Sequence, residues 1–232
     1  MTTTTKQPPP IELVTHVARS LGALTEEVVF VGGAITGMLL TDEAAPAVSA
    51  TKDVDVIVSV TTRSEYLGGL SSRMRSLGFH EDSSEDAPMC RWRLGDSRGV
   101  KLDLMPTDPM ILGFSNRWFP GAFESAVPRT LPSGQTIRVV TAPYFLATKL
   151  EAFAGRGAGD YIGSKDMEDF VAVVHGRPTP KARRAPWLAP PRSAILRPPC
   201  PPPKTPARSP GQRSPAAAPL RSSATPTPAR PR

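Results

Sequence analysis

The clearest pattern along the chain is an alternation of acidic and apolar residues between positions 51 and 60. The segment reads Thr-Lys-Asp-Val-Asp-Val-Ile-Val-Ser-Val. Because side chains alternate between the two faces of a strand, Asp53 and Asp55 lie on one face and the valines on the other. The pattern predicts a buried strand over 53–60 with two carboxylates side by side at its start.

A second pattern precedes this strand and ends at a pair of glycines. An apolar, β-branched and aromatic run over 28–31, in an expected strand over 27–31, stops at Gly32 and Gly33 and continues as a short apolar segment. This order is typical of a buried strand that turns tightly into a helix, here over 34–41. The glycines then lie at a helix N-terminus, where free N–H groups and the absence of side chains favour phosphate binding.

Helical and alternating patterns continue to residue 176 and predict a mixed architecture. Helices are expected over 11–24, 64–77 and 143–153 and after Ser164, and strands over 89–94, 100–105 and 136–141. The expected buried stripes of the four helices are Leu13, Val14, Val17, Ala18 and Leu21; Tyr66, Leu67, Leu70, Met74 and Leu77; Leu146, Leu150 and Phe153; and Phe170, Val173 and Val174. The predicted fold is α/β (α+β), a small mixed β-sheet with flanking helices.

Composition divides the chain into two parts near Gly176. Residues 177–232 hold 12 of the 28 Lys and Arg residues, none of the 21 Asp and Glu residues, and 17 of the 28 prolines. The formal net charge of +7 therefore belongs to this segment, and the first 176 residues are acidic. Such a segment buries too little apolar surface to fold, so we expect a disordered basic tail over 177–232 and a disordered lead over 1–10. The tail has two interpretations, a polyanion-binding segment and a frameshift product of GC-rich DNA.

The cysteine, histidine and hydropathy patterns argue against a secreted protein, a zinc site and a membrane span. The two cysteines lie far apart, the three histidines are scattered, and the N-terminus is polar and proline-rich. We therefore expect a cytoplasmic protein with no zinc site. No segment approaches the roughly 18 consecutive apolar residues of a membrane span, so no membrane partner is expected.

The paired carboxylates of Asp53 and Asp55 need a physical reason, because like charges a few ångströms apart repel each other. Mg²⁺ supplies one, since it typically takes one or two protein carboxylates and completes its shell with substrate phosphates. The alternative is structural, with Asp53 as a strand cap and Asp55 as a solvated edge residue.

Two glycines, a helix and Asp-x-Asp on the next strand resemble the signature of the DNA polymerase β-like nucleotidyltransferases. The spacing from Gly33 to Thr-Lys-Asp-Val-Asp is most similar to the AbiEii-type branch of abortive-infection and toxin–antitoxin proteins. The resemblance implies a nucleotidyltransferase fold over 11–176, in which Gly32 and Gly33 hold the nucleoside triphosphate and the aspartates hold Mg²⁺. Many members have Ser or Thr after the glycines, whereas this chain has Ala34, and Thr36 is the candidate substitute.

A third acidic residue follows on a later expected strand. In Val-Lys-Leu-Asp-Leu-Met, residues 100–105, Asp103 projects from the face opposite the apolar residues. It matches the third carboxylate of the polymerase β-like pattern, which implies metal binding by Asp53, Asp55 and Asp103 together. The alternative is a paired surface aspartate.

A second block also resembles the AbiEii-type enzymes, in which a Lys-containing helix is followed by Arg-Asp-x-x-Asp. Here the block is Lys149, Arg156, Lys165-Asp166 and Asp169, with Lys165 in place of the usual arginine. The resemblance implies that Lys149 contacts nucleotide phosphate and that Asp166 supports catalysis. Arg156 lies two turns beyond Lys149 on the same helical face and is expected to reach a polyphosphate. The alternative is an amphipathic helix with a solvated charged face.

The resemblance of both blocks implies a Mg²⁺-dependent nucleotidyltransferase. It would transfer a nucleoside monophosphate from an NTP to an RNA, protein or small-molecule acceptor, as a toxin with an antitoxin partner. Two other enzyme classes do not fit. The glycines do not follow the G-x-G-x-x-G pattern of a Rossmann dehydrogenase, and no Gly-Lys-Ser/Thr follows them as in a P-loop NTPase. The remaining alternative is a degenerate, non-catalytic module of the same fold that binds a nucleotide or a partner protein.

Overall fold

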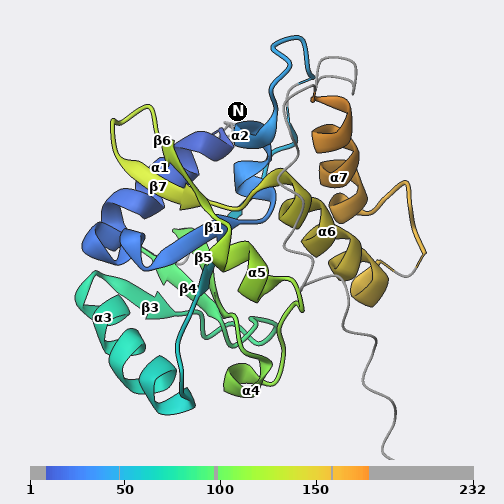
Figure 1. Cartoon of the computed structure of the whole chain (residues 1–232). Coiled ribbons are helices and arrows are strands. Elements are labelled where there is room, and N and C mark those ends of the chain that lie inside the picture. The colour runs from blue at the N-terminus through green and yellow to red at the C-terminus, as the bar shows by residue number, and fades with distance from the viewer. Residues whose placement is uncertain (1–8, 47, 97–98, 158, 178–232) are drawn as a thin grey trace, which may run out of the picture. The chain divides into compact units, whose positions relative to one another are not determined.

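The structure is a computed structural model that describes residues 9–46, 48–96, 99–157 and 159–177 (Figure 1). The expected disordered lead and tail fall almost entirely outside these residues. The helices are α1 (Pro10–Leu21), α2 (Thr36–Leu39), α3 (Ser71–Ser76), α4 (Pro109–Leu112), α5 (Phe119–Glu124), α6 (Ala142–Arg156) and α7 (Lys165–His175), with 3₁₀ turns η1 (Gly22–Glu26) and η2 (Gly33–Ile35) and a π-helical segment η3 (Glu65–Leu70). The strands are β1 (Val28–Val31), β2 (Asp53–Val58), β3 (Phe79–Glu81), β4 (Arg91–Leu94), β5 (Val100–Pro106), β6 (Val127–Thr130) and β7 (Thr136–Val139).

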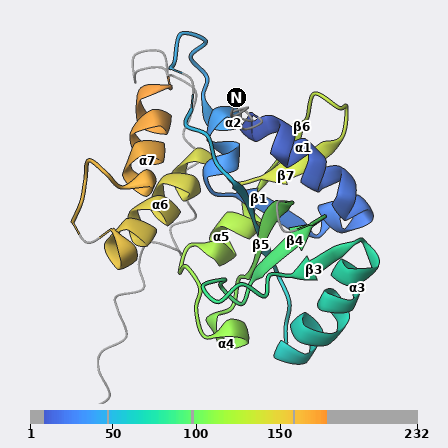
Figure 2. The same ribbon diagram turned by 180° about the vertical axis from the view of Figure 1, so that it is seen from behind.

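The described strands form one mixed sheet in the order β3-β4-β5-β2-β1-β7-β6. The central strand β2 pairs antiparallel with β1 and parallel with β5, and β1 pairs parallel with β7. Helices α3 and α7 lie at opposite ends of this arrangement, and α6 and α7 run side by side in both views (Figures 1 and 2). The expected fold class, a mixed sheet with flanking helices, is confirmed.

Strand register brings one row of side chains together across the sheet. Val31 of β1 pairs with Asp55 of β2, Asp55 pairs with Asp103 of β5, and Asp103 pairs with Arg91 of β4. Paired residues on neighbouring strands project from the same face with Cβ atoms about 4.5–5.5 Å apart. Asp55 and Asp103 are therefore neighbours on one face of the sheet.

The apolar faces of the central strands form the core as the alternation predicts. Val54 and Val56 are fully buried, as are Leu102 and Leu104 of β5. The expected stripe of α1 is also confirmed, because all five of its residues are buried. Burial of apolar surface contributes about 25 cal/mol per Å², so these faces hold the sheet against its helices.

The expected helix over 64–77 differs from the structure in its first half. Residues 65–70 form a π-helical segment that includes Gly68 and Gly69, and the α-helix begins only at Ser71. Because a π-helical turn holds more residues, the stripe drawn for an α-helix shifts there. Tyr66, Leu70 and Met74 are buried as expected, but Leu67 is 48% exposed.

The two C-terminal helices bury only part of the apolar stripes that the sequence predicts. On α6, Phe145, Lys149 and Phe153 are buried, and the predicted core residue Leu150 is 46% exposed. On α7, Asp166, Asp169 and Val173 are buried, whereas Val174 is 51% exposed. Phe153 and Val173 are thus buried as predicted, whereas the prediction was wrong for Leu150 and Val174, because charged side chains occupy part of the interface between the two helices.

The turn after β1 depends on a glycine. Gly32 has φ +70° and ψ −169°, a conformation that is essentially restricted to glycine. A Cβ atom on Gly32 would lie 1.9 Å from Asp55 Oδ2, which is shorter than any non-bonded contact. The first glycine therefore makes the turn and also leaves room for the Asp55 carboxylate.

We expect Gly32→Ala to destabilise the fold by about 1–3 kcal/mol from backbone strain, and further through the clash with Asp55. Urea unfolding measures this loss. Gly113→Ala is the matched control, because Gly113 is left-handed at φ +81° but has no atom within 4 Å of its Cβ position. Equal losses in the two variants would show that the Asp55 carboxylate moves aside freely.

Candidate active site

The paired residues Asp55, Asp103 and Arg91 of the sheet line a cavity of about 510 Å³. Its walls come from β2, β4 and β5, from α6 and α7, and from the segment that joins these helices. The lining residues are Gly33, Thr51, Asp53, Asp55, Arg91, Asp103, Lys149, Arg156, Gly157, Asp160, Gly163, Ser164, Lys165, Asp166 and Asp169. Segments more than 100 positions apart in the sequence thus contribute charged side chains to one cavity.

Among the described carboxylates that line the cavity, that of Asp55 is the one without a hydrogen-bond or ion-pair partner. It makes no hydrogen bond and no ion pair with any residue in the described part of the chain. Burial raises its pKa to about 7, and the negative charges of Asp53 and Asp103 add to this effect. An ionised carboxylate in such surroundings is stabilised by a cation.

Asp53 and Asp103 flank Asp55, and both lie near a guanidinium group. Arg91 Nε and Nη2 donate to the two oxygens of Asp103, both at 2.7 Å. Arg91 Nη2 also lies 3.6 Å from Asp53 Oδ2, and Thr51 Oγ1 donates to Asp53 Oδ1 at 2.8 Å. Sequence reasoning did not single out Arg91. The sequence signal for Arg91 was its alternation with an apolar residue, Trp92, which places Arg91 and Arg93 on the same face of the expected strand.

Lys149 lies on the opposite wall and contacts two carboxylates of α7. Its Nζ donates to Asp169 Oδ2 at 2.7 Å and to Asp166 Oδ1 at 3.2 Å. Burial by itself lowers the pKa of Lys149, but the charges of Asp169 and Asp166 outweigh it and raise that pKa above its ordinary value. Lys149 is therefore charged and held between α6 and α7, with one of its three N–H groups left over.

Two further cations complete this cluster at the rim. Arg156 donates from Nε and Nη2 to the two oxygens of Asp166, each at 2.9 Å, while its side chain stays 73% exposed. Lys165 Nζ donates to Asp169 Oδ1 at 3.1 Å. The four carboxylate oxygens of Asp166 and Asp169 are thus all engaged by cations.

Of the glycine pair and the residues that follow it, some line the cavity and others are buried in the protein core. Gly33 lines the cavity, and a Cβ atom there would lie 3.1 Å from Asp169 Oδ2. Gly32 lies beneath the Asp55 carboxylate. Thr36, the candidate substitute for a phosphate-binding hydroxyl, does not line the cavity, and its fully buried Oγ1 has no hydrogen-bond partner among the described residues. Ala34 is buried as well.

The carboxylates fit a magnesium ion in part. The described residues contain no group of three or more His, Cys, Asp or Glu side chains already arranged around a metal position. Asp53 and Asp55 nevertheless offer the oxygen ligands that Mg²⁺ prefers, and Asp55 lacks a cation. Asp103, the expected third ligand, instead has both oxygens on Arg91.

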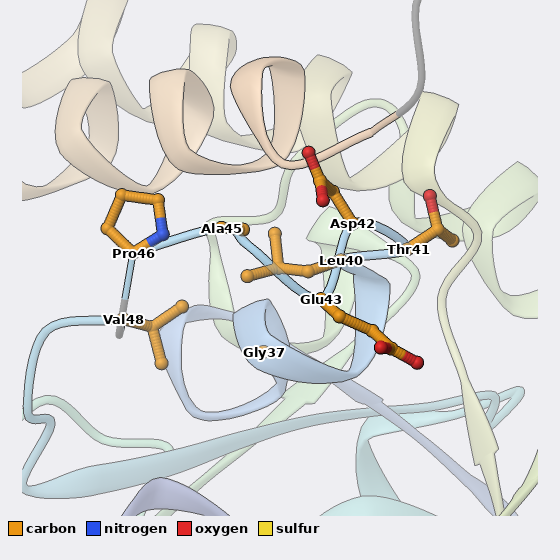
Figure 3. Close-up of a pocket in the computed structure, with 8 residues that line it drawn as sticks. All are labelled: Gly37, Leu40, Thr41, Asp42, Glu43, Ala45, Pro46 and Val48. Atoms are coloured by element: carbon orange, nitrogen blue, oxygen red, sulfur yellow. The ribbon is translucent and has the colours of Figure 1, made fainter.

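A second cavity, of about 520 Å³, lies beside α2 and the loop that follows it (Figure 3). Most of its lining is apolar or backbone, including Gly37, Leu40 and Val48. Its two carboxylates, Asp42 and Glu43, point in different directions in Figure 3. This cavity therefore lacks the convergent charges of the first one.

The described helices are all too short or too polar to cross a bilayer.

Comparisons with known proteins give a likeness in fold only. The sequence matches no protein-family profile and no curated protein. Among solved structures, an antigenic nucleotidyltransferase-like protein from Paracoccidioides brasiliensis is similar at 18% identity and a TM-score of 0.48, over 72% of this chain and 76% of that one. ANT(2")-Ia in complex with adenylyl-2"-tobramycin is similar at 13% identity and a TM-score of 0.41, over 71% of this chain and 87% of that one. At these scores, a likeness does not assign a substrate.

The raised pKa of Asp55 has a consequence for stability. In the unfolded chain this carboxyl ionises near its ordinary pKa of 3.8, but in the fold only near 7. Ionisation therefore destabilises the fold progressively between these values and fully above pH 7. A pKa difference of about 3 corresponds to at most about 4 kcal/mol. We therefore expect Asp55→Asn to raise Tm by up to roughly 8–16 °C at pH 8 in EDTA, and to have little effect at pH 3.5. A Tm increase that is equal at both pH values would contradict this origin.

The buried position of Lys149 generates a second prediction. Lys149→Met leaves Asp166 and Asp169 without their buried cation, so we expect a loss of about 3–5 kcal/mol in the free energy of unfolding. Arg156→Met is the matched control on the same helix. Its exposed side chain predicts a loss of at most about 1 kcal/mol. Denaturant titration at pH 7 measures both, and similar losses would show that burial of Lys149 does not set its contribution.

Proposed function

We propose that the cavity catalyses the transfer of a nucleoside monophosphate from an NTP to an acceptor. The observation that carries the proposal is the unpartnered Asp55 carboxylate, which lies between Asp53 and Asp103 and above the Gly32 backbone. A cluster of three acids in which Asp55 has no ion-pair partner among the described residues, beside a glycine turn, suits a metal-bound triphosphate. The opposite wall supplies Lys149 and Arg156, which suit phosphate oxygens.

The chain's own groups have distinct roles in this reaction. Gly33 presents backbone to the β- and γ-phosphates, and the remaining N–H of Lys149 offsets negative charge on the leaving pyrophosphate. Asp53 and Asp55 would hold Mg²⁺, which withdraws charge from the phosphates when it is bound. Asp166 holds Lys149 and Arg156 in place, which makes it a positioning residue.

The transfer is a single displacement at the α-phosphorus. An acceptor oxygen forms a bond to this phosphorus as the bond to the oxygen that bridges to the β-phosphate breaks, and pyrophosphate leaves with that electron pair. The acceptor's proton passes to Asp103, whose carboxylate retains lone pairs beyond the two used by Arg91. The acceptor is a hydroxyl or phosphate of an RNA, a protein or a small molecule, and a toxin role with an antitoxin partner belongs to the same proposal.

The test uses the full chain with α-³²P-labelled NTPs, Mg²⁺ and cell RNA or protein. We expect label to enter one acceptor fraction, and we expect Asp53→Ala with Asp55→Ala to reduce this by at least about 100-fold, because the metal-holding charges are gone. Asp86→Ala is the matched control, since Asp86 is exposed and lies outside the cavity.

Two outcomes separate this proposal from its alternative. Incorporation that is unchanged in the double variant contradicts the assignment of the site. Nucleotide binding without incorporation, measured by calorimetry on the unaltered chain, favours a non-catalytic module. The buried Thr36 hydroxyl, which does not line the cavity, is the observation that keeps this alternative in view.

A further inference from the structure

Arg91 faces the acidic row because of strand pairing. Its position on β4 pairs with Asp103 on β5, which pairs in turn with Asp55 on β2. The residues before and after Arg91 in the sequence, Cys90 and Trp92, are both buried. The backbone register therefore places Arg91 on the face of the sheet that carries the carboxylates, and the contacts of its side chain place the guanidinium beside them.

The contacts of Arg91 cover two of the three carboxylates. Both oxygens of Asp103 accept hydrogen bonds at 2.7 Å, and Asp53 Oδ2 lies 3.6 Å from Nη2. Only 18% of the Arg91 side chain and 11% of the Asp103 side chain is exposed, so water screens this pair weakly. A bidentate pair of this kind is among the stronger hydrogen-bonded arrangements in proteins.

A second metal ion on Asp103 would meet this guanidinium at short range. In two-metal sites the ions lie about 3.5–4 Å apart and share carboxylates, so the second ion would share Asp103 with Arg91. Two positive groups on one weakly screened carboxylate repel each other. One guanidinium and one divalent ion, in contrast, balance the three negative charges of Asp53, Asp55 and Asp103.

We propose that Arg91 takes the place of a second metal ion, so that this cavity binds one divalent cation, on Asp53 and Asp55. The inference rests on the proposed function and specifies its metal requirement. Arg91 Nη1 makes no hydrogen bond with the residues that the structure describes, and Arg91 lines the cavity. Its two N–H groups are therefore available to an oxygen of the acceptor or of the α-phosphate.

The test counts bound Mn²⁺ on the full chain at pH 8, by electron paramagnetic resonance of the free ion. We expect one site on the unaltered chain and two on Arg91→Gln, because removal of the guanidinium frees Asp103. Arg93→Gln is the matched control: Arg93 lies two residues along β4, pairs with Asp82 at 2.9 Å and does not line the cavity. It is expected to bind one ion.

Further variants keep the test decisive if Arg91→Gln fails to fold. Asp103→Asn alone is expected to keep the single site within about threefold of its affinity, because Asp103 is not its ligand. Arg91→Gln combined with Asp103→Asn is expected to return the count to one. Two sites on the unaltered chain, one site on a folded Arg91→Gln, or a tenfold loss of affinity in Asp103→Asn each overturn the role of Arg91. An unaltered chain that binds no Mn²⁺ overturns the proposed function as well.

Discussion

The parallel pairing of β2 with β5 is the constraint on which the rest of the site depends. It aligns Asp55 with Asp103 on one face of the sheet and the valines and leucines of the same strands on the other. A slip of one residue would exchange the two faces, so the apolar core that stabilises the fold also fixes the register of the carboxylates. Repulsion between the acids is thus opposed by the burial of apolar side chains behind them.

The cavity wall formed by α6 and α7 contains a buried cation, Lys149, that needs anionic partners. Lys149 comes from a helical face that is otherwise apolar, between Phe145 and Phe153. A buried ammonium group is unfavourable unless it is paired, and α7 supplies Asp166 and Asp169 for this purpose. Arg156 and Lys165 then compensate these acids at the rim. The two helices are joined by ion pairs that also form the surface of the cavity.

Local patterns in the sequence were sufficient for the sheet's centre. The alternation around Asp53 and Asp55 and the glycine turn predicted β1, β2 and the acidic face, because each depends on residues close in sequence. The faces of α6 and α7 were not predictable in the same way. Leu146 and Leu150 form as good an apolar stripe as the real one, and only the partner helix decides that Lys149 faces inward.

Arg91 illustrates the same limit within the site. Its role depends on which strand lies next to β5, and sheet order is a property of the whole chain. An arginine in an alternating strand carries no local sign of the aspartate twelve residues later that accepts its hydrogen bonds. The third carboxylate was recognisable from its strand, but its pairing with a cation was not.

The end of α7 also defines how short a working fragment can be. The Gly176 carbonyl accepts hydrogen bonds from the backbone N–H groups of Thr41 and Asp42, at 2.9 and 3.1 Å, and Arg177 Nη1 donates to the Leu39 carbonyl at 2.6 Å. These bonds fasten the last described helix to the segment that follows the glycine turn. A fragment cut before Gly176 would release α7 from this anchor and open the cavity on that side, whereas a cut after Arg177 would retain every lining residue that the structure describes.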